Sequence, residues 1–100
     1  MNETQPQIRA AETQAGGHYV VAMPNGEDAR LTWRHLGEGV IEADHTFVPV
    51  AYREQGIAEA LVERLVADAR AAGRTIVPSC WFVADEFKRH HPDWDDVLAR

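Results

Sequence analysis

The residues best suited to chemistry lie at positions 53–58, where a short polar turn joins an apolar, β-branched run to an amphipathic helical pattern. The first N–H groups of a helix that begins here have no intrahelical acceptor, and together with the helix dipole they form a site for an anion, most often a phosphate. Gly56 lets a ligand approach the backbone closely, and the Arg53 guanidinium matches the geometry of phosphate oxygens. The pattern therefore predicts a phosphate site, although a plain strand-to-helix connection, with glycine for tight packing, explains these residues equally well.

A second polar group, His90, His91 and Asp93, has the residue types of a metal site but not the spacing. Adjacent histidines on a helix point about 100° apart, and no second pair of ligands follows at the spacing of a zinc site. We therefore expect no bound metal. The neighbouring Lys88 and Arg89 are expected to contact solvent or a phosphate.

The composition indicates one soluble globular domain and excludes several classes of protein. Of 100 residues, 45% are hydrophobic and 26% charged, and the net charge of −6 with scattered basic residues argues against nucleic-acid binding. The single cysteine, Cys80, excludes an internal disulfide and favours a reducing, cytoplasmic location. No apolar run approaches the ~18 residues of a membrane span, and residues 1–6, which we expect to be loose, lack the pattern of a signal peptide.

Strands are expected on both sides of the candidate phosphate turn. Residues 18–23 are β-branched and aromatic, residues 29–35 alternate between apolar and polar side chains, and residues 39–48 form a third strand. Residues 24–27, Pro-Asn-Gly-Glu, are a hairpin signal because Asn-Gly accepts positive φ angles. Residues 7–13 give a weaker strand signal, so the first half of the chain predicts an antiparallel meander.

The second half of the chain is predicted to contain a strand and two helical segments besides the helix that follows the turn. Residues 75–77 and 80–83 form one strand interrupted at Pro78, because proline donates no ladder hydrogen bond. A short helix over residues 84–90 and a last turn around residues 97–98 complete the chain. The tryptophans expected to pack in the core or at its rim are Trp33, Trp81 and Trp94.

The helix over residues 56–72 carries the clearest pattern, with a 3.6-residue apolar period and Gly73 as its C-terminal stop. The predicted fold is mixed α/β (α+β), a mostly antiparallel sheet packed against this central helix in one domain over residues 7–100.

Several segments together resemble the GNAT N-acetyltransferase superfamily. Residues 53–58, Arg-Glu-Gln-Gly-Ile-Ala, fit its signature Arg/Gln-x-x-Gly-x-Gly/Ala at a strand-to-helix junction. Residues 44–49, 76–80 and 89–94 look like the corresponding segments of the small single-domain GNAT-like proteins, which keep little beyond the coenzyme A binding core. The resemblance covers residues 7–98 and implies a minimal GNAT-like fold.

The resemblance further implies that acetyl-CoA is the ligand and that its diphosphate lies against the turn and the helix start. The residues implied to contact the diphosphate are Arg53, Gln55, Gly56, Ile57 and Ala58. Those implied to contact the pantetheine are Phe47 and Val48, on a strand that would splay from the next one to admit the thioester. Glu54 departs from the glycine usual in this subfamily, and its carboxylate would repel a diphosphate unless it points into solvent or pairs with Arg53.

Transfer of an acetyl group to an amine requires a proton acceptor, because a lysine-type amine has a pKa near ~10.4. His45 is the candidate, since it ends the strand implied to contact the pantetheine, although a structural histidine bonded to nearby backbone explains it as well. Glu42 and Asp44 are near, but strand alternation would place both opposite to His45.

Cys80 lies on the strand expected to splay, and members of the resembled subfamily carry a cysteine here. The resemblance implies a nucleophile or a proton donor to the leaving thiolate, while a small buried cysteine is the alternative. No tyrosine follows in residues 84–90, where larger relatives often keep a general acid, and this favours Cys80.

The predicted function is acetyl-CoA-dependent N-acetyltransfer to a primary amine, either a small amine or a protein lysine or N-terminus. Transfer would be direct or, as the less favoured route, through an acetylated Cys80, and the negative net charge favours a cationic acceptor. One alternative is a non-catalytic module that binds or senses acyl-CoA, because the chain lacks the segments with which larger relatives shape an acceptor pocket. Another, suggested by Glu54, is an interaction domain that has kept the fold and lost the ligand.

Overall fold

The described residues form one five-stranded sheet. The computed structural model describes residues 7–24, 26–90 and 93–99, so the predicted loose residues 1–6 and Asn25 of the hairpin turn lie outside the described part. The strands, in the order in which they lie in the sheet, are β1 (Arg9–Glu12), β2 (Gly16–Val21), β3 (Ala29–Gly37), β4 (Val40–Phe47) and β5 (Thr75–Pro78). The pairs from β1 to β4 are antiparallel, which confirms the meander, and β5 joins β4 in parallel.

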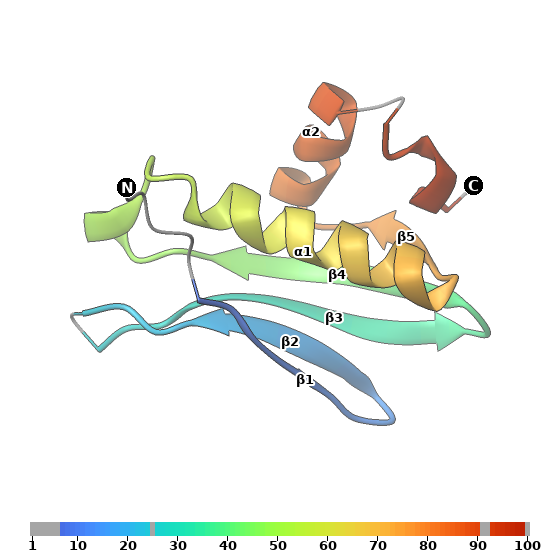
Figure 1. The fold of residues 1–100 in the computed structure, drawn as a ribbon, viewed down its shortest axis with the longest axis horizontal. Coiled ribbons are helices and arrows are strands. Elements are labelled where there is room, and N and C mark those ends of the chain that lie inside the picture. The colour runs from blue at the N-terminus through green and yellow to red at the C-terminus, as the bar shows by residue number, and fades with distance from the viewer. Residues whose placement is uncertain (1–6, 25, 91–92, 100) are drawn as a thin grey trace.

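Both α-helices lie on the same side of this sheet (Figure 1). They are α1 (Ile57–Ala72) and α2 (Trp81–His90), and two short 3₁₀ helices accompany them, η1 (Val50–Tyr52) and η2 (Asp95–Val97). Within the described part of the chain, no helix covers the opposite face, which we call the outer face. The sheet therefore has one buried face and one face whose side chains lie at the surface.

The core forms where α1 packs on the sheet. Its apolar stripe includes Leu61, Val62 and Leu65, which are at most 1% exposed, and it meets Leu31 of β3 and Ile76 of β5, both fully buried. Burying one such aliphatic side chain contributes about 1.5–3 kcal/mol, so this contact fixes the position of α1 over the sheet. The start of α1 is thereby held beside the end of β4.

The helix α1 ends as the sequence predicts. Gly73 adopts φ +72°, and its N–H donates to the carbonyls of Ala69 and Arg70. Only glycine adopts this left-handed conformation without steric cost, and here it satisfies carbonyls that the helix leaves without intrahelical donors.

The predicted strand over residues 80–83 is wrong, because α2 begins at Trp81, directly after Cys80. Strand β5 ends at Pro78, and the Ser79 N–H donates to the Val77 carbonyl in a tight turn. The Ala84 N–H then donates to the Cys80 carbonyl, which starts the helix. Val83 and Phe87, four residues apart, are buried on one face of α2, so the apolar residues follow the helical period rather than the strand period.

Candidate functional site

Strand β4 extends beyond its partner β5 and leaves a gap at one edge of the sheet. The last residues paired between the two strands are Ala43 and Pro78. One more hydrogen bond holds them together, from the Cys80 N–H to the Ala43 carbonyl at 3.0 Å. Beyond it, β4 continues to Phe47 while the chain after β5 turns away into α2. The splayed strands expected from the resemblance are therefore present.

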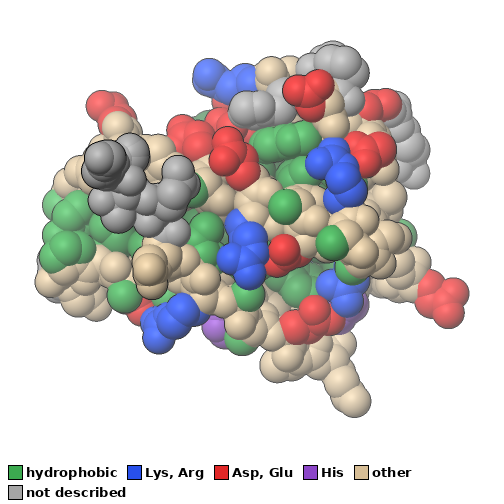
Figure 2. All heavy atoms as spheres, viewed as in Figure 1, with side chains coloured by type: hydrophobic (Ala, Val, Ile, Leu, Met, Phe, Trp, Pro, Cys, Tyr) green, Lys and Arg blue, Asp and Glu red, His purple; other side chains and the backbone are tan. Residues whose placement is uncertain are grey.

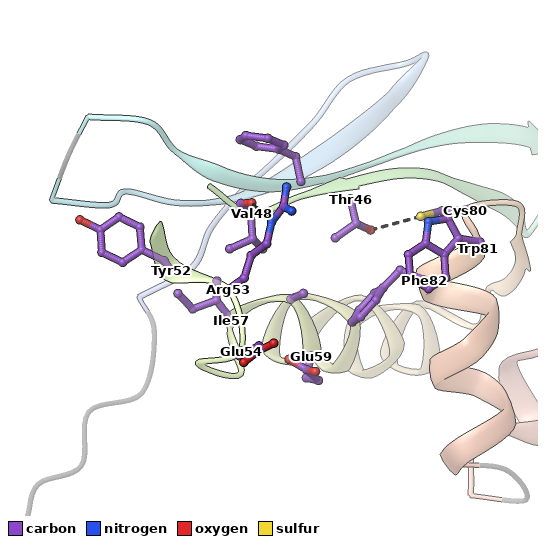
Figure 3. A pocket seen from close by; sticks show the side chains of 12 residues that line it. Thr46, Val48, Tyr52, Arg53, Glu54, Ile57, Glu59, Cys80, Trp81 and Phe82 are labelled. Atoms are coloured by element: carbon purple, nitrogen blue, oxygen red, sulfur yellow. Dashed lines mark hydrogen bonds between the residues drawn. The ribbon is translucent and has the colours of Figure 1, made fainter. Parts of the chain in front are cut away.

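A cavity of about 480 Å³ fills the gap between the end of β4, the start of α1 and the start of α2. Figure 3 shows the side chains that line it. Those from β4 and the following turn are Thr46, Phe47, Val48, Tyr52, Arg53 and Glu54; those from α1 are Ile57, Ala58 and Glu59; those around the start of α2 are Cys80, Trp81 and Phe82. The volume is that of a small-molecule site, and much of the wall is apolar.

The start of α1 forms one end of this cavity. The Ala60 N–H donates to the Gly56 carbonyl at 3.0 Å and makes the first hydrogen bond of the helix. The N–H groups of residues 57–59 precede it and therefore have no intrahelical acceptor. Ile57, Ala58 and Glu59 all line the cavity, so this helix end provides the expected environment for an anionic group.

Arg53 and Glu54 lie at the same end but do not pair with each other. The Arg53 Nε donates to the Val48 carbonyl at 3.0 Å, and Figure 3 shows the Arg53 side chain directed away from Glu54. Glu54 precedes the start of α1 and Glu59 lies in its first turn, and both line the cavity. The cavity wall therefore carries two carboxylates and one guanidinium where the diphosphate was predicted.

Glu54 also has an unusual backbone conformation. Its φ is +67°, in the left-handed region, and it is the only non-glycine residue of the described chain with a positive φ. Gly56, two residues later, has φ +83° and caps α1. Side chains with a Cβ adopt this region only at a cost in free energy, which gives a physical reason for glycine at position 54 in the resembled subfamily.

Cys80 and Thr46 lie across the gap from each other. The Cys80 thiol contacts the Thr46 hydroxyl, with 3.7 Å between Sγ and Oγ1 (Figure 3). Both residues are partly buried, so the sulfur lies in the cavity wall rather than in the core. The sequence singled out Cys80 but not Thr46, whose position in the cavity depends on an irregularity in β4.

That irregularity is a β-bulge at Asp44. Thr32 pairs with His45 and Trp33 pairs with Ala43, so Asp44 is an extra residue in β4. Because Thr32 lies between the buried Leu31 and Trp33, the row containing Thr32 and His45 faces the outer side of the sheet. The Thr32 hydroxyl donates to the Asp44 carboxylate at 2.7 Å. The prediction that Glu42 and Asp44 face oppositely to His45 is therefore wrong. Glu42 pairs with the exposed Arg34 and shares the outer face with His45, because the bulge at Asp44 interrupts the alternation between them.

The predicted site residues divide into two groups. Those that line the cavity are Phe47, Val48, Arg53, Ile57, Ala58 and Cys80; those that do not are His45, Gln55 and Gly56. Phe47 pairs with Arg30 on the outer side, and its ring lies 5.6 Å from the Arg30 guanidinium, so its backbone rather than its ring faces the gap. His45 is exposed on the outer face. Strand β4 therefore lies between the His45 side chain and Cys80.

Glu42 helps to hold the turn that precedes Cys80. Its carboxylate accepts hydrogen bonds from the Ser79 hydroxyl and, at 2.6 Å, from the Arg34 Nε. These two partners, Ser79 first, hold the pKa of Glu42 below its ordinary value, which makes the carboxylate a poor proton acceptor. We assign Glu42 a structural role, because it connects β3, β4 and the turn after β5.

Other site types receive no support from the described residues. Among them, no three His, Cys, Asp or Glu side chains are grouped as metal ligands; His91 and the side chain of His90 lie outside the description, so the absence of a metal stays a prediction. No described helix has the length and apolar character needed to cross a membrane. On the face seen in Figure 2, basic side chains are separated and interspersed with acidic ones, so that face shows no basic patch.

Comparisons with known proteins agree with this geometry. A family model described as GCN5-related N-acetyl-transferase matches residues 18–97. The fold is similar to the NMR solution structure of a GCN5-like protein from Staphylococcus aureus, with a TM-score of 0.69 and 21% sequence identity over 97% of this chain and 91% of that one. At this identity the structural likeness supports the fold, while the family model covers both the cavity and the strands around it.

Proposed function

Because the chain belongs to the GCN5-related N-acetyltransferase family, we propose that it binds acetyl-CoA in the cavity at the end of β4 and transfers the acetyl group to a primary amine. The observation that carries the proposal is the cavity itself, which runs from the unsatisfied N–H groups of α1 to the Cys80 thiol. One end suits a diphosphate and the other suits a thioester.

The residues around the cavity have distinct roles in this proposal. The first N–H groups of α1 and the Arg53 side chain would hold the diphosphate, with Gln55 and Gly56 contributing backbone only. The edge of β4 near Phe47 and Val48 that has no strand partner offers backbone groups to the amides of pantetheine, although the Val48 carbonyl already accepts from Arg53. Acetyl-CoA, when bound, supplies the activated acyl group, and the apolar wall excludes water from it.

We assign Cys80 to the acyl end because its sulfur lines the gap where β4 and β5 separate. There it would donate a proton to the leaving thiolate during direct transfer, with a covalent acetyl-cysteine as the alternative route. His45 lies on the outer face, so its proposed role as proton acceptor requires an amine that reaches the gap from that side. The acceptor in this proposal is a small amine or a protein lysine or N-terminus.

Two measurements test the proposal in sequence. Calorimetric titration with acetyl-CoA and with CoA tests the cavity as their binding site; the proposal is abandoned if neither binds at millimolar concentration. Thiol release over a panel of amines then tests transfer, and binding without release would favour the non-catalytic acyl-CoA module.

Variants at Cys80 and Thr46 test the assignment of the acyl end. Cys80→Ala should bind acetyl-CoA normally and lower kcat, whereas an unchanged kcat would show that Cys80 has no chemical role. Thr46→Val keeps the shape of the opposite wall and removes only the hydroxyl in contact with Cys80, so it tests that contact, while Cys80→Ser is the matched control for packing lost in Cys80→Ala.

A further inference from the structure

Trp81 is an exposed aromatic side chain at the acyl end of the cavity. Its side chain is 77% exposed, whereas Trp33 and Trp94 are 5% and 8% exposed. It lines the cavity directly after Cys80. Because an indole is among the side chains that gain most from burial, its exposure beside a cavity indicates a surface that a ligand covers.

We infer that Trp81 recognises the acceptor, and that the acceptor is a cationic amine on an aliphatic stem, such as a lysine side chain or an alkylamine. The inference rests on the proposed function, which places the thioester near Cys80. Figure 3 shows Cys80, Trp81 and Phe82 at one end of the cavity and Tyr52, Arg53 and Glu54 at the other. Trp81 therefore lies away from the predicted diphosphate and next to the place where donor and acceptor must meet.

The surroundings of Trp81 favour this class of ligand. The Phe82 ring packs edge-to-face against the indole, with centroids 6.0 Å apart and an interplanar angle of 81°, which restrains the ring that a ligand would contact. An indole face binds a cation and an alkyl chain together, and the net charge of −6 attracts a cation to the protein.

Fluorescence measures this contact without requiring turnover. Since Trp33 and Trp94 are buried, acrylamide quenching of the emission reports mainly on Trp81. Three probes separate the two parts of the ligand: hexylamine has the stem and the charge, hexanol the stem alone, and ethanolamine the charge with a minimal stem. We expect hexylamine, added to the CoA complex and to the free protein, to protect Trp81 best. Equal effects of hexylamine and hexanol would overturn the cationic part of the inference.

Steady-state kinetics with hexylamine complete the test. Trp81→Ala should raise the KM for the amine about fivefold, with kcat and the Kd for acetyl-CoA unchanged, while Trp81→Phe should retain most of the affinity. Leu36→Ala removes another exposed apolar side chain, 49% exposed and remote from the cavity lining, as a control.

The outcomes separate this inference from the proposed function. If Trp81→Ala weakens acetyl-CoA and leaves the amine KM unchanged, Trp81 belongs to the donor site and the inference is overturned while the transferase proposal stands. If the protein neither binds acetyl-CoA nor acetylates an amine, the transferase proposal fails. In that case the fluorescence titration alone decides the inference, and no protection of Trp81 by hexylamine overturns it.

Discussion

Replacing Glu54 with glycine should both stabilise the protein and tighten its binding of acetyl-CoA. Glu54 is exposed and has φ +67°, and a left-handed conformation costs a residue with a Cβ about 1–2 kcal/mol. Glycine also makes the unfolded chain more flexible, which lowers the free energy of unfolding by about 0.4–1 kcal/mol. The difference predicts a net gain of about 0.8 kcal/mol at the midpoint of these two ranges for Glu54→Gly, or about 3–6 °C in Tm for a domain of this size.

The effect on binding has a different cause and needs its own variant. Glu54→Gln removes the charge and keeps the left-handed backbone, so it should leave Tm almost unchanged. A carboxylate within ~6 Å of a diphosphate, in a solvated position, weakens binding about threefold or more at low salt. Glu54→Gln and Glu54→Gly should therefore lower the Kd for acetyl-CoA by a similar factor, and added salt should reduce the difference from wild type.

Gly56 provides the matched control for the backbone argument. It has φ +83°, and a Cβ added there would meet nothing within 4 Å, so Gly56→Ala changes conformational cost without a steric clash. We expect Gly56→Ala to lower the free energy of unfolding by about 1 kcal/mol. Thermal unfolding and calorimetric titration of the variants measure both effects. If Glu54→Gln raises Tm as much as Glu54→Gly, backbone strain is not the cause; if neither changes the Kd, Glu54 does not face the diphosphate.

Three further predictions concern residues outside the turn. The lowered pKa of Glu42 means that its contribution to stability is complete above the ordinary value of 4.5 and is lost as pH falls below it. Glu42→Gln should therefore reduce the fall in the free energy of unfolding between neutral and acidic pH, measured by urea unfolding. If the variant loses as much stability at acidic pH as the wild type, the role of Glu42 is contradicted. Tyr19→Phe should cost about 0.5–1.5 kcal/mol, because the buried Tyr19 hydroxyl donates to Asp68 at 2.9 Å, and chemical denaturation with unchanged m-value would measure it. His45→Gln should leave the Kd for acetyl-CoA within a factor of about two, since His45 is not part of the cavity wall, and a larger change in calorimetry would mean that the outer face takes part in donor binding.

The sequence allowed the meander, the central helix and the family to be predicted, because each depends on a local pattern. Alternation in β3 and the 3.6-residue period of α1 are set by which face is buried. The strand predicted at residues 80–83 was wrong because the local pattern does not decide the structure there. Cys-Trp-Phe-Val has the composition of a strand, but the turn at Ser79 and the burial of Val83 and Phe87 on one face select a helix. Tertiary packing overrides a propensity of this size.

The site was predicted in part. Residues at the start of α1 and Cys80 were identified by motif, and six of the nine predicted residues line the cavity. The places of Thr46 and His45 were not accessible to sequence reasoning, because a single extra residue at Asp44 changes which side chains face the gap. Trp81 fits the expected rim position, but its 77% exposure is a property of the folded α2 start.

The bulge at Asp44 also has a consequence for how the chain tolerates substitution. On a sheet with one buried face, tolerance along a strand alternates with a period of two residues. In β4 the sensitive positions should be Ile41 and Ala43 before the bulge, then Thr46 and Val48 after it, so the alternation should shift by one residue at Asp44. A complete set of single substitutions across residues 40–48 would show this shift as two adjacent tolerant positions. Deleting Asp44 should remove the bulge and restore regular alternation, with His45 still paired with Thr32 on the outer face and Val48 still on the buried side.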